Sequence, residues 1–533
     1  MRGADVLVQT LARAGVRRIF SLSGNQIMPV YDACIDAGIE IVHTRHEAAA
    51  VFMADASAQL TGQVGIALVT AAPGFGNALG ALYTARASES PVVLLSGAAP
   101  ISQDGKGAFQ ELPQAEMAAP VTKLSFRASS AASLASDVAR ALRTSLSGRP
   151  GPVHVALPFD LLEAEVPGDA LPAEPSLRAE AMAASASDVA AIQAALGGAL
   201  RPLILTGPSM NATRAGEVLS RLAIAVDAPV VPMESPRGLR DPSLGDFARA
   251  LAKADLVVSL GKAVDFTLGF GAEAVCDPSC AWLVVSADDA ERDRAHRNLG
   301  GRLKRYVAAD PRAVAAALAG SSAMADRAAW CGEVAGLIAA RGFSSRAEAK
   351  ITPAALCAAV QRRIDAAESP ILICDGGEFG QWAQACLAAE RRLINGPSGA
   401  IGSGLCYGIA AKMARPGSTV FVLTGDGSLG FHLSEFETAA REGTPLVVVV
   451  GNDQCWNAEH QIQLRRYGPD RLIGCALSGA RYDQAATGLG GHGEHVTDLA
   501  ELDAALGRAL ASGKPACVNV AMAGLPAPAG SSH

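Results

Sequence analysis

Two short acidic segments in the last third of the chain have the residue types of a metal and phosphate site. Gly425-Asp426-Gly427-Ser428 follows one buried apolar run, and Asn452-Asp453 follows the next. A helix over Leu433–Glu442 and a strand over Pro445–Val450 are expected between them, which returns the chain to the same sheet edge. Oxygen ligands suit a hard cation that bridges to a diphosphate, and the Gly-rich turn lets phosphates approach the backbone. The plainer alternative is a turn with surface carboxylates.

Other polar segments also follow expected strands. His46-Glu47 comes after the first expected strand, Pro73–Asn77 after the second, and Asp375-Gly376-Gly377 after one in the last third. In open parallel sheets, ligands bind outside the carboxyl ends of the strands. Turns alone also favour Gly, Asn and Asp, and an acid at Glu47 is favoured at any helix N-terminus. The placement therefore suits a site but does not by itself prove one.

The elements that must position these residues alternate along the chain. Apolar β-rich runs are separated by Ala-rich helical stretches, which predicts an α/β protein with three doubly wound parallel sheets. The expected strands are Ile39–His43, Val64–Thr70, Pro91–Ser96, Val153–Ala156, Pro202–Leu205, Pro229–Val231, Leu256–Leu260, Trp282–Ser286, Ile371–Cys374, Val420–Leu423, Leu446–Val450 and Ala516–Val520.

The length of the chain fits three domains. At 533 residues it holds about three units of roughly 100–200 residues each. A linker-like stretch near Val166–Pro175 and a polar and Ala-rich stretch near Gly320–Lys350 divide it into expected domains 1–165, 185–325 and 350–525.

Composition excludes several classes of protein. Half of the residues are hydrophobic and 18% are charged, which argues against disorder, and the net charge of −7 argues against a nucleic-acid partner. No basic patch or long apolar run predicts a membrane partner. The 11 Cys show no CxxC pair and the nine His no zinc pattern, which favours free thiols in a soluble cytoplasmic protein.

The segment GDGS…NDQCW resembles the thiamine-diphosphate signature of the acetolactate synthase and benzaldehyde lyase superfamily. The resemblance implies that Asp426, Asp453 and the backbone oxygen of Cys455 bind Mg²⁺. It also places Gly425, Gly427, Ser428 and Trp456 beside the cofactor. The sequence departs from the family in having Asp453 where Asn is commoner; a carboxylate still binds Mg²⁺ and adds a negative charge.

The same resemblance assigns the rest of the cofactor site. Glu47 is the acid that serves the aminopyrimidine ring, and Asn77 lies near the cofactor. Within Gly396–Gly404, Ile401 props the cofactor into its bent form and Gly399 offers a backbone carbonyl. The loop Asp375–Phe379 resembles a diphosphate-contacting loop, with Gly377, Glu378 and Phe379 as its contacts.

Substrate-facing residues are also implied. Phe109-Gln110-Glu111 resembles the Phe-Gln-Glu of acetolactate synthases, so Phe109 and Gln110 are expected near the reacting carbon. Gln26 falls where benzaldehyde lyase has an active-site His, and Ala458 falls on a substrate-lining position. Gln26 and Gln110 are thus expected to serve catalysis, and the alternative for both is a solvated loop amide.

The resemblance covers nearly the whole chain. It implies a pyrimidine-binding domain, a central domain and a diphosphate- and Mg²⁺-binding domain, in a homodimer or homotetramer with sites shared between subunits. The expected activity is carbon–carbon lyase or carboligase chemistry on a small 2-oxo acid or aldehyde. The alternatives are a 2-hydroxyacyl-CoA lyase or oxalyl-CoA decarboxylase, or a catalytically silent subunit. FAD or ADP in the central domain is not favoured, because Gly261–Phe266 gives no clear nucleotide motif.

Overall fold

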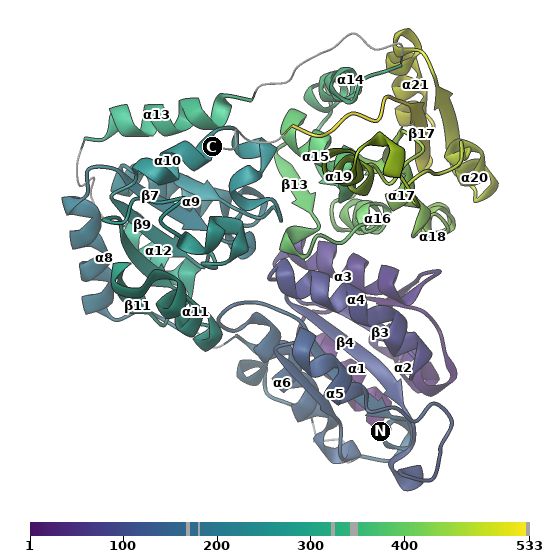
Figure 1. Ribbon diagram of the computed structural model, residues 1–533. Coiled ribbons are helices and arrows are strands. Elements are labelled where there is room, and N and C mark those ends of the chain that lie inside the picture. The colour runs from purple at the N-terminus through teal and green to yellow at the C-terminus, as the bar shows by residue number, and fades with distance from the viewer. Residues whose placement is uncertain (167–170, 180–181, 321–325, 342–349, 529–533) are drawn as a thin grey trace. The chain divides into compact units, whose positions relative to one another are not determined.

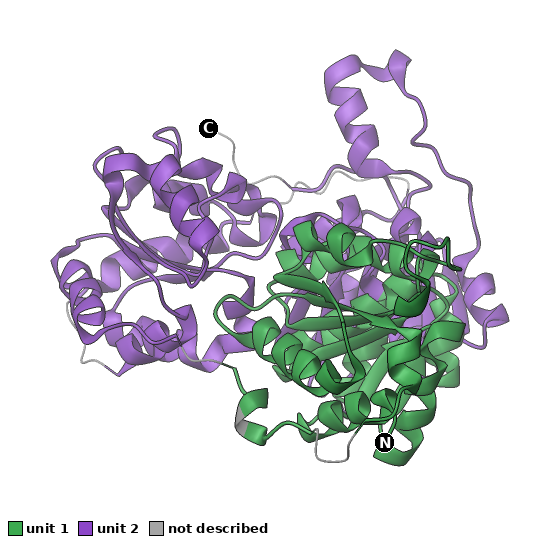
Figure 2. Ribbon diagram, turned by 90° about the horizontal axis from the view of Figure 1, so that it is seen from below, with its two compact units in different colours: residues 1–180, 405–416, 432–445 green, residues 181–404, 417–431, 446–533 purple. Residues whose placement is uncertain are grey.

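The computed structural model describes residues 1–166, 171–179, 182–320, 326–341 and 350–528. These residues form two compact units (Figure 2). Unit 1 comprises Met1–Glu180, Leu405–Pro416 and His432–Pro445, and unit 2 comprises Ala181–Gly404, Gly417–Phe431 and Leu446–His533. Two stretches from late in the sequence therefore fold with the N-terminal unit. No helix in the described ranges is both long enough and apolar enough to cross a membrane.

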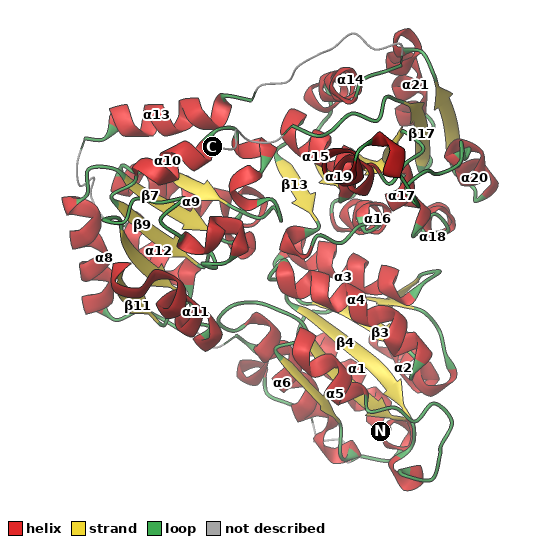
Figure 3. Ribbon diagram, viewed as in Figure 1, coloured by secondary structure: helices red, strands yellow, loops and turns green. Residues whose placement is uncertain are grey.

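Unit 1 is built on one sheet (Figure 3). Its strands are parallel and their order is β2-β1-β3-β4-β6-β5. One face packs on α1, α2 and α6 around a core of Leu, Ile and Val side chains, while α3 and α4 lie side by side over the sheet (Figure 1). Its strands are β1 (Arg18–Ser21), β2 (Glu40–His43), β3 (Gly65–Val69), β4 (Val92–Ala98), β5 (Leu124–Arg127) and β6 (Val153–Pro158). Its helices are α1 (Gly3–Arg13), α2 (Met28–Ala37), α3 (Glu47–Thr61), α4 (Pro73–Ala87), α5 (Gln114–Ala118), α6 (Leu134–Leu146), α7 (Phe159–Glu163), most of α16 (Gly404–Ala414) and α18 (Glu435–Arg441).

Helix α3 is the buried element of unit 1. It begins after His46, whose extended backbone and ring Nδ1 cap the helix by accepting from the Ala48 N–H, and it ends at Gly62 in the left-handed conformation. Its small residues allow close packing: a Cβ on Gly65 of β3 would lie 2.0 Å from the Ala54 carbonyl oxygen. On α16, the Tyr407 hydroxyl donates to the buried carboxylate of Asp55 on α3.

Unit 2 holds two parallel sheets (Figure 3). The first has the order β11-β10-β9-β7-β8, and separate apolar cores cover its two faces. It contains β7 (Pro202–Thr206), β8 (Val230–Pro232), β9 (Leu256–Leu260), β10 (Ala281–Val285) and β11 (Leu303–Val307), with α8 (Ala186–Gly198), α9 (Ala212–Val226), α10 (Phe247–Lys253), α11 (Asp289–Leu299), α12 (Pro311–Ala319) and α13 (Ala328–Ala339).

The second sheet of unit 2 has the order β13-β12-β14-β15-β17-β16, and α14, α15 and α21 pack on one of its faces. It contains β12 (Ile371–Cys374), β13 (Arg391–Ile394), β14 (Val420–Gly425), β15 (Val447–Asn452), β16 (His492–Val496) and β17 (Ala516–Ala521). Its helices are α14 (Pro353–Asp365), α15 (Gly377–Cys386), α17 (Asp426–Gly430), α19 (Asn457–Tyr467), α20 (Tyr482–Gly488) and α21 (Leu499–Ala511).

The α/β class with three parallel sheets is confirmed, and each expected strand is found with its ends shifted by a residue or two. Five strands were missed, namely β1, β5, β11, β13 and β16. All five carry charged side chains, and four of them are edge strands, where solvent tolerates charge and the apolar run is interrupted. Because β1 was missed, Glu47 follows the second strand of the chain and Pro73 the third, not the first and second.

One smaller expectation was also wrong. The helix expected over Leu433–Glu442 is shorter, spanning Glu435–Arg441, and α17 precedes it, starting directly at Asp426. The polar and Ala-rich stretch Gly320–Lys350, which leads into the last third of the chain, contains α13, whose Trp330 and Val334 bury an apolar face. Residues 321–325 and 342–349 of that stretch, and 167–170 of the expected linker, lie outside the described residues. The three domain boundaries stay predictions.

We expect Tyr407→Phe to lower the stability of unit 1 by about 1.5–3 kcal/mol, because it removes a hydrogen-bond donor from a buried carboxylate. The urea midpoint of the transition reported by unit 1 measures the effect. Tyr83→Phe, which changes an exposed tyrosine on α4, is the matched control. Equal midpoints for the two variants would contradict the importance of the Tyr407–Asp55 bond.

Candidate functional site

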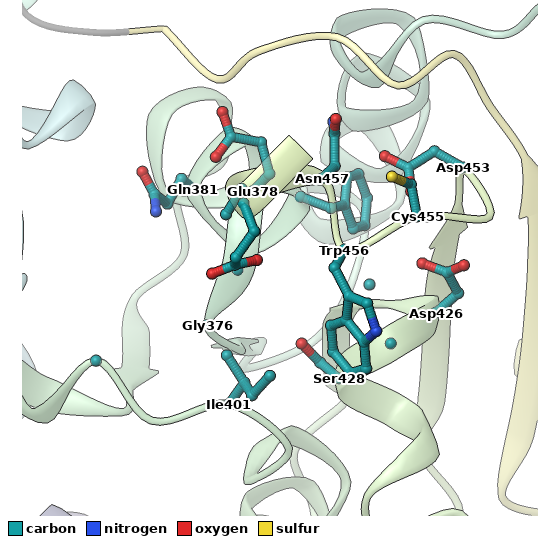
Figure 4. Close-up of a pocket in the computed structure, with 18 residues that line it drawn as sticks. Gly376, Glu378, Gln381, Ile401, Asp426, Ser428, Asp453, Cys455, Trp456 and Asn457 are labelled. Carbon is teal, nitrogen blue, oxygen red and sulfur yellow. The ribbon is translucent and has the colours of Figure 1, made fainter. Parts of the chain in front are cut away.

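A pocket of about 220 Å³ opens at the carboxyl edge of the last sheet (Figure 4). The strand ends of β12, β14 and β15 and the first turns of α15, α17 and α19 form its wall. Its lining residues are Gly376, Gly377, Glu378, Phe379, Gln381, Gly399, Ile401, Gly425, Asp426, Gly427, Ser428, Gly451, Asp453, Cys455, Trp456, Asn457, Ala458 and Glu459.

Two carboxylates face this pocket from neighbouring strands. Strands β14 and β15 pair in parallel with Gly425 opposite Gly451, which brings Asp426 and Asp453 to the same edge. Burial raises the pKa of Asp426 to about 6, although hydrogen bonds from the backbone N–H groups of Gly427, Gln454 and Cys455 act to lower it. Burial and then the charge of Asp426 raise the pKa of Asp453 to about 7. Each carboxylate is therefore costly to ionise without a cation beside it.

The donor set fits a hard cation. Oδ2 of Asp426 is buried and has no hydrogen-bond donor, so a lone pair is left for another partner. Figure 4 shows Asp426, Asp453 and Cys455 on one side of the pocket and Glu378 on the other. Within the described residues, no three His, Cys, Asp or Glu side chains gather as metal ligands. An ion here would need backbone, water or ligand oxygens in addition to the two carboxylates, as Mg²⁺ usually does.

Asp375 organises the floor of the pocket. It is buried at the end of β12 and accepts from the backbone N–H groups of Gly376, Gly402 and Gly404 at 2.7, 3.0 and 3.1 Å. The Thr424 hydroxyl on β14 donates to the same carboxylate at 3.1 Å. One desolvated carboxylate thereby joins two strand ends to the loop that carries Ile401.

Glycines keep the pocket open where larger residues would close it. A Cβ at Gly427 would lie 2.5 Å from the Trp456 ring, and one at Gly376 would lie 2.5 Å from the Ala400 carbonyl oxygen. Gly377 has a φ of +79°, which favours glycine, and the N–H groups at the start of α15 stay available to an anion. Close approach therefore requires glycine at positions 376 and 427, and the left-handed backbone favours it at position 377.

Glu378 lines the pocket while its carboxylate is held by other groups. The Ala527 N–H donates to Oε1 at 2.6 Å, and the Arg237 guanidinium lies 3.4 Å from Oε2. These partners offset a negative charge that would otherwise disfavour a diphosphate at the α15 N-terminus.

Glu47 is placed in unit 1 as the first residue of α3. It is buried, and the Asn77 side chain of α4 donates to its Oε2 at 2.9 Å. A Cβ on Gly74 would approach Oε1 of Glu47 to 3.3 Å. The segment Gly74–Asn77, which was expected near the cofactor, therefore contacts the acid directly.

Gln26 and Gln110 form a hydrogen-bonded amide pair in unit 1. Nε2 of Gln26 donates to Oε1 of Gln110 at 2.7 Å, and the Thr70 hydroxyl donates to Oε1 of Gln26 at 2.6 Å. Gln26 is buried, so it is not the solvated loop amide that the alternative expected. The neighbouring Phe109 is 74% exposed.

The structure thus gathers the predicted residues into two groups. The pocket holds Gly377, Glu378, Phe379, Gly399, Ile401, Gly425, Asp426, Gly427, Ser428, Asp453, Cys455, Trp456 and Ala458. Glu47, Asn77, Gln26, Gln110 and Phe109 lie in unit 1. Sequence reasoning missed the roles of Asp375, Gln381, Asn457 and Glu459. Only Asp375 carried a signal, as an acid at a buried strand end before two glycines.

We expect Asp453→Asn to stabilise the protein measured without divalent ions. A carboxyl whose pKa is raised by folding destabilises the fold once the pH exceeds its unfolded value of about 4, and for Asp453 this penalty is complete above about pH 7. The unfolding midpoint at pH 8 should rise by the equivalent of about 1–3 kcal/mol, and the gain should vanish near pH 4. Asp470→Asn, at an exposed site, should show neither change. A gain independent of pH would contradict this origin.

Comparison with known proteins agrees with this site. Residues 1–117 match the family "Thiamine pyrophosphate enzyme, N-terminal TPP binding domain", and residues 375–520 match the corresponding C-terminal TPP binding domain. The chain is 33% identical to a probable acetolactate synthase of Mycobacterium bovis, over 98% of this chain and 95% of the relative. It is 30% identical to 2-hydroxyacyl-CoA lyase 2 of Danio rerio, over 92% and 86%, and 29% identical to that of Homo sapiens, over 92% and 84%.

The matched ranges contain both groups of predicted residues: Glu47 lies in the first, and the two pocket carboxylates lie in the second. Both kinds of relative align with nearly the whole chain. The chain belongs to the thiamine pyrophosphate enzymes and is a thiamine-diphosphate-dependent carbon–carbon lyase or carboligase.

Proposed function

We propose that the pocket of unit 2 binds thiamine diphosphate through Mg²⁺. Asp426, Asp453 and the backbone oxygen of Cys455 would hold the metal, and the N–H groups of Gly377, Gly427 and Ser428 would face the diphosphate. The observation that carries this proposal is the pair of largely desolvated carboxylates, of which Asp426 is buried and has one oxygen without a donor. When bound, the cofactor supplies a nucleophilic carbon that attacks a substrate carbonyl. Ile401, Gly399, Phe379 and Trp456 would shape its binding site.

We propose that Glu47 holds the proton that the aminopyrimidine ring of the cofactor requires. Asn77 fixes its carboxyl group, and burial keeps water from competing for that proton. Glu47 belongs to unit 1 and the pocket to unit 2, so we propose a homodimer or homotetramer in which Glu47 of one subunit serves the cofactor of another. Gln26 and Gln110 would hydrogen-bond the substrate, and Phe109 and Ala458 would line its path.

We propose a small 2-oxo acid or aldehyde as the substrate, in an acetolactate-synthase-like or benzaldehyde-lyase-like reaction. The Gln26–Gln110 pair, in which Gln26 is buried and Gln110 is partly exposed, supports this choice, because it provides neutral hydrogen bonds suited to a carbonyl or carboxylate oxygen. The acetolactate synthase relative, which aligns over 98% of this chain, points the same way.

A 2-hydroxyacyl-CoA lyase or oxalyl-CoA decarboxylase activity is the second candidate. Burial lowers the pKa of Arg237, and the nearby guanidinium groups of Arg465 and Arg240 lower it further. Arg237, which contacts Glu378 of the pocket, thus has two further guanidinium groups near it, and such a cluster would stabilise the phosphates of a CoA ester. The 2-hydroxyacyl-CoA lyase relatives support the same reading.

We propose that the remaining features follow the family plan. Domain 1–165 would bind the pyrimidine, 350–525 the diphosphate and Mg²⁺, and the central domain 185–325 would bind no FAD or ADP. Lys262, the cation of the segment Gly261–Phe266, is buried and donates to the Ala263 carbonyl and to Asp265. These contacts argue against a role for Lys262 in binding the phosphates of a nucleotide. All 11 cysteines are described and none forms a disulfide, which supports a cytoplasmic location.

Replacing Glu47 tests both the acid and the alternative of a catalytically silent subunit. We expect Glu47→Gln to slow proton–deuterium exchange at cofactor C2 by about 10²–10⁴-fold, because the ring loses its proton donor. The exchange is followed by NMR after acid quenching, with Mg²⁺ and cofactor added. Glu40→Gln, an exposed change on β2, is the control and should exchange like the parent. A silent subunit would show no rapid exchange even in the parent protein.

A substrate panel separates the two candidate activities. We expect purified enzyme with Mg²⁺ and thiamine diphosphate to turn over pyruvate or benzoin faster than oxalyl-CoA or a 2-hydroxyacyl-CoA. Arg465→Gln should then leave turnover of the small substrate unchanged, since no phosphate needs this cation. A preference for a CoA ester that falls in the Arg465→Gln variant would reverse the choice.

A further inference from the structure

Helix α18 contacts the turn that carries Glu47. Oε1 of Glu435 accepts from the backbone N–H of Arg45 at 2.9 Å, and the backbone N–H of His46 also hydrogen-bonds to this carboxyl group. These two N–H groups immediately precede Glu47, the first residue of α3. Both segments belong to unit 1, although nearly 400 positions separate them in the sequence.

The Glu435 carboxylate is fully buried, with 0% of the residue exposed. A desolvated carboxylate binds its remaining donors more strongly than a hydrated one does, and its position near a helix N-terminus is favoured by the helix dipole. The Thr438 hydroxyl, also buried, donates to Oε2 at 2.6 Å and orients the carboxylate toward the turn.

Neighbouring contacts hold the same turn from other sides. The Arg441 guanidinium, at the end of α18, donates to the His43 carbonyl oxygen, and the Thr44 hydroxyl donates to the His46 carbonyl at 2.8 Å. The rings of His46 and His432 meet edge to face with centroids 5.5 Å apart. These contacts restrict the movement of the turn. Glu435 binds the backbone N–H groups of both Arg45 and His46.

We propose that Glu435 is a positioning residue for Glu47: it fixes the turn Arg45-His46 and so sets where the Glu47 carboxyl group lies. The proposal rests on the proposed role of Glu47 in cofactor activation. Glu435 touches neither cofactor nor substrate and acts only through the backbone that it holds.

Glu435→Gln tests this role with an almost isosteric side chain. The amide carries no charge and has one acceptor oxygen in place of two, so the two backbone N–H groups lose the charge-assisted hydrogen bonds that a carboxylate gives them. We expect C2 exchange to slow by about 10–100-fold, because a small displacement of a catalytic group has effects of this order. Thiamine diphosphate affinity, measured by fluorescence quenching, should change by less than about threefold, since a tenfold change needs a loss comparable to a full hydrogen bond.

The second readout needs no cofactor. Hydrogen–deuterium exchange of the backbone amides of Arg45 and His46, measured on the apo protein, should accelerate in Glu435→Gln. Glu217→Gln, which makes the same charge change at an exposed position of α9, is the control. The control should leave both C2 exchange and amide exchange at the parent values.

Thr438 provides a milder pair of variants should Glu435→Gln fold poorly. Thr438→Val removes the hydroxyl that orients Glu435 and should slow C2 exchange, while Thr438→Ser keeps the hydroxyl and should restore it. Parent-like C2 exchange in Glu435→Gln or Thr438→Val would overturn the proposal, provided that Glu47→Gln is slow in the same assay. Parent-like exchange in Glu47→Gln itself would instead remove the proposed function on which the inference rests.

Discussion

Desolvation of two carboxylates at neighbouring strand ends is the constraint on which the proposed cofactor site depends. Asp426 and Asp453 end neighbouring parallel strands, so the sheet register alone forces their charges together. The cost appears as raised pKa values for both groups, and protonation or a cation beside the carboxylates would relieve it. The protein thus carries a local instability at a place prepared for a ligand, as is common where binding sites are built in advance of their ligands.

The backbone around the pair is shaped to keep that geometry without filling the pocket. The buried carboxylate of Asp375 accepts hydrogen bonds from three backbone N–H groups and one hydroxyl. These bonds join the ends of β12 and β14 to the loop that carries Ile401. Glycines then stand where any side chain would meet the Trp456 ring or the Ala400 carbonyl. Hydrogen bonds to the buried Asp375 carboxylate make the wall of the pocket rigid, and glycines, which have no side chain, keep the pocket open.

Hydrogen bonds to buried side chains also hold the polar groups of unit 1 in place. Glu435 uses a buried carboxylate to hold the two N–H groups before Glu47, and Asn77 holds the carboxyl group of Glu47 itself. Gln26 and Gln110 are linked in turn to Thr70. The polar side chains for which we propose a role in the chemistry are thus held by hydrogen bonds within unit 1, which limits the loss of alignment that catalysis tolerates poorly.

Much of the fold and of the cofactor pocket could be predicted from the sequence, for a local reason. Buried parallel strands are continuous apolar runs, and the residues after them face one sheet edge, so Asp426, Asp453 and the glycines between them could be placed from the sequence alone. Four of the five strands that were missed, among them β11 and β13, are edge strands whose charges interrupt the apolar run. Their side chains lie partly in solvent, where hydrophobic patterning carries no signal.

Only the tertiary structure decided which groups hold the reacting residues. No periodicity relates Glu435 to Arg45 or Tyr407 to Asp55, because these contacts join segments that lie far apart in the chain and depend on how helices pack. Likewise, the sequence named Asn77 and Glu378 but not their partners, which are Glu47 for the first and Ala527 with Arg237 for the second. By itself the sequence determined the chemistry, since residue type and strand-end position are local properties. The structure decided its alignment, since that arises from long-range packing and desolvation.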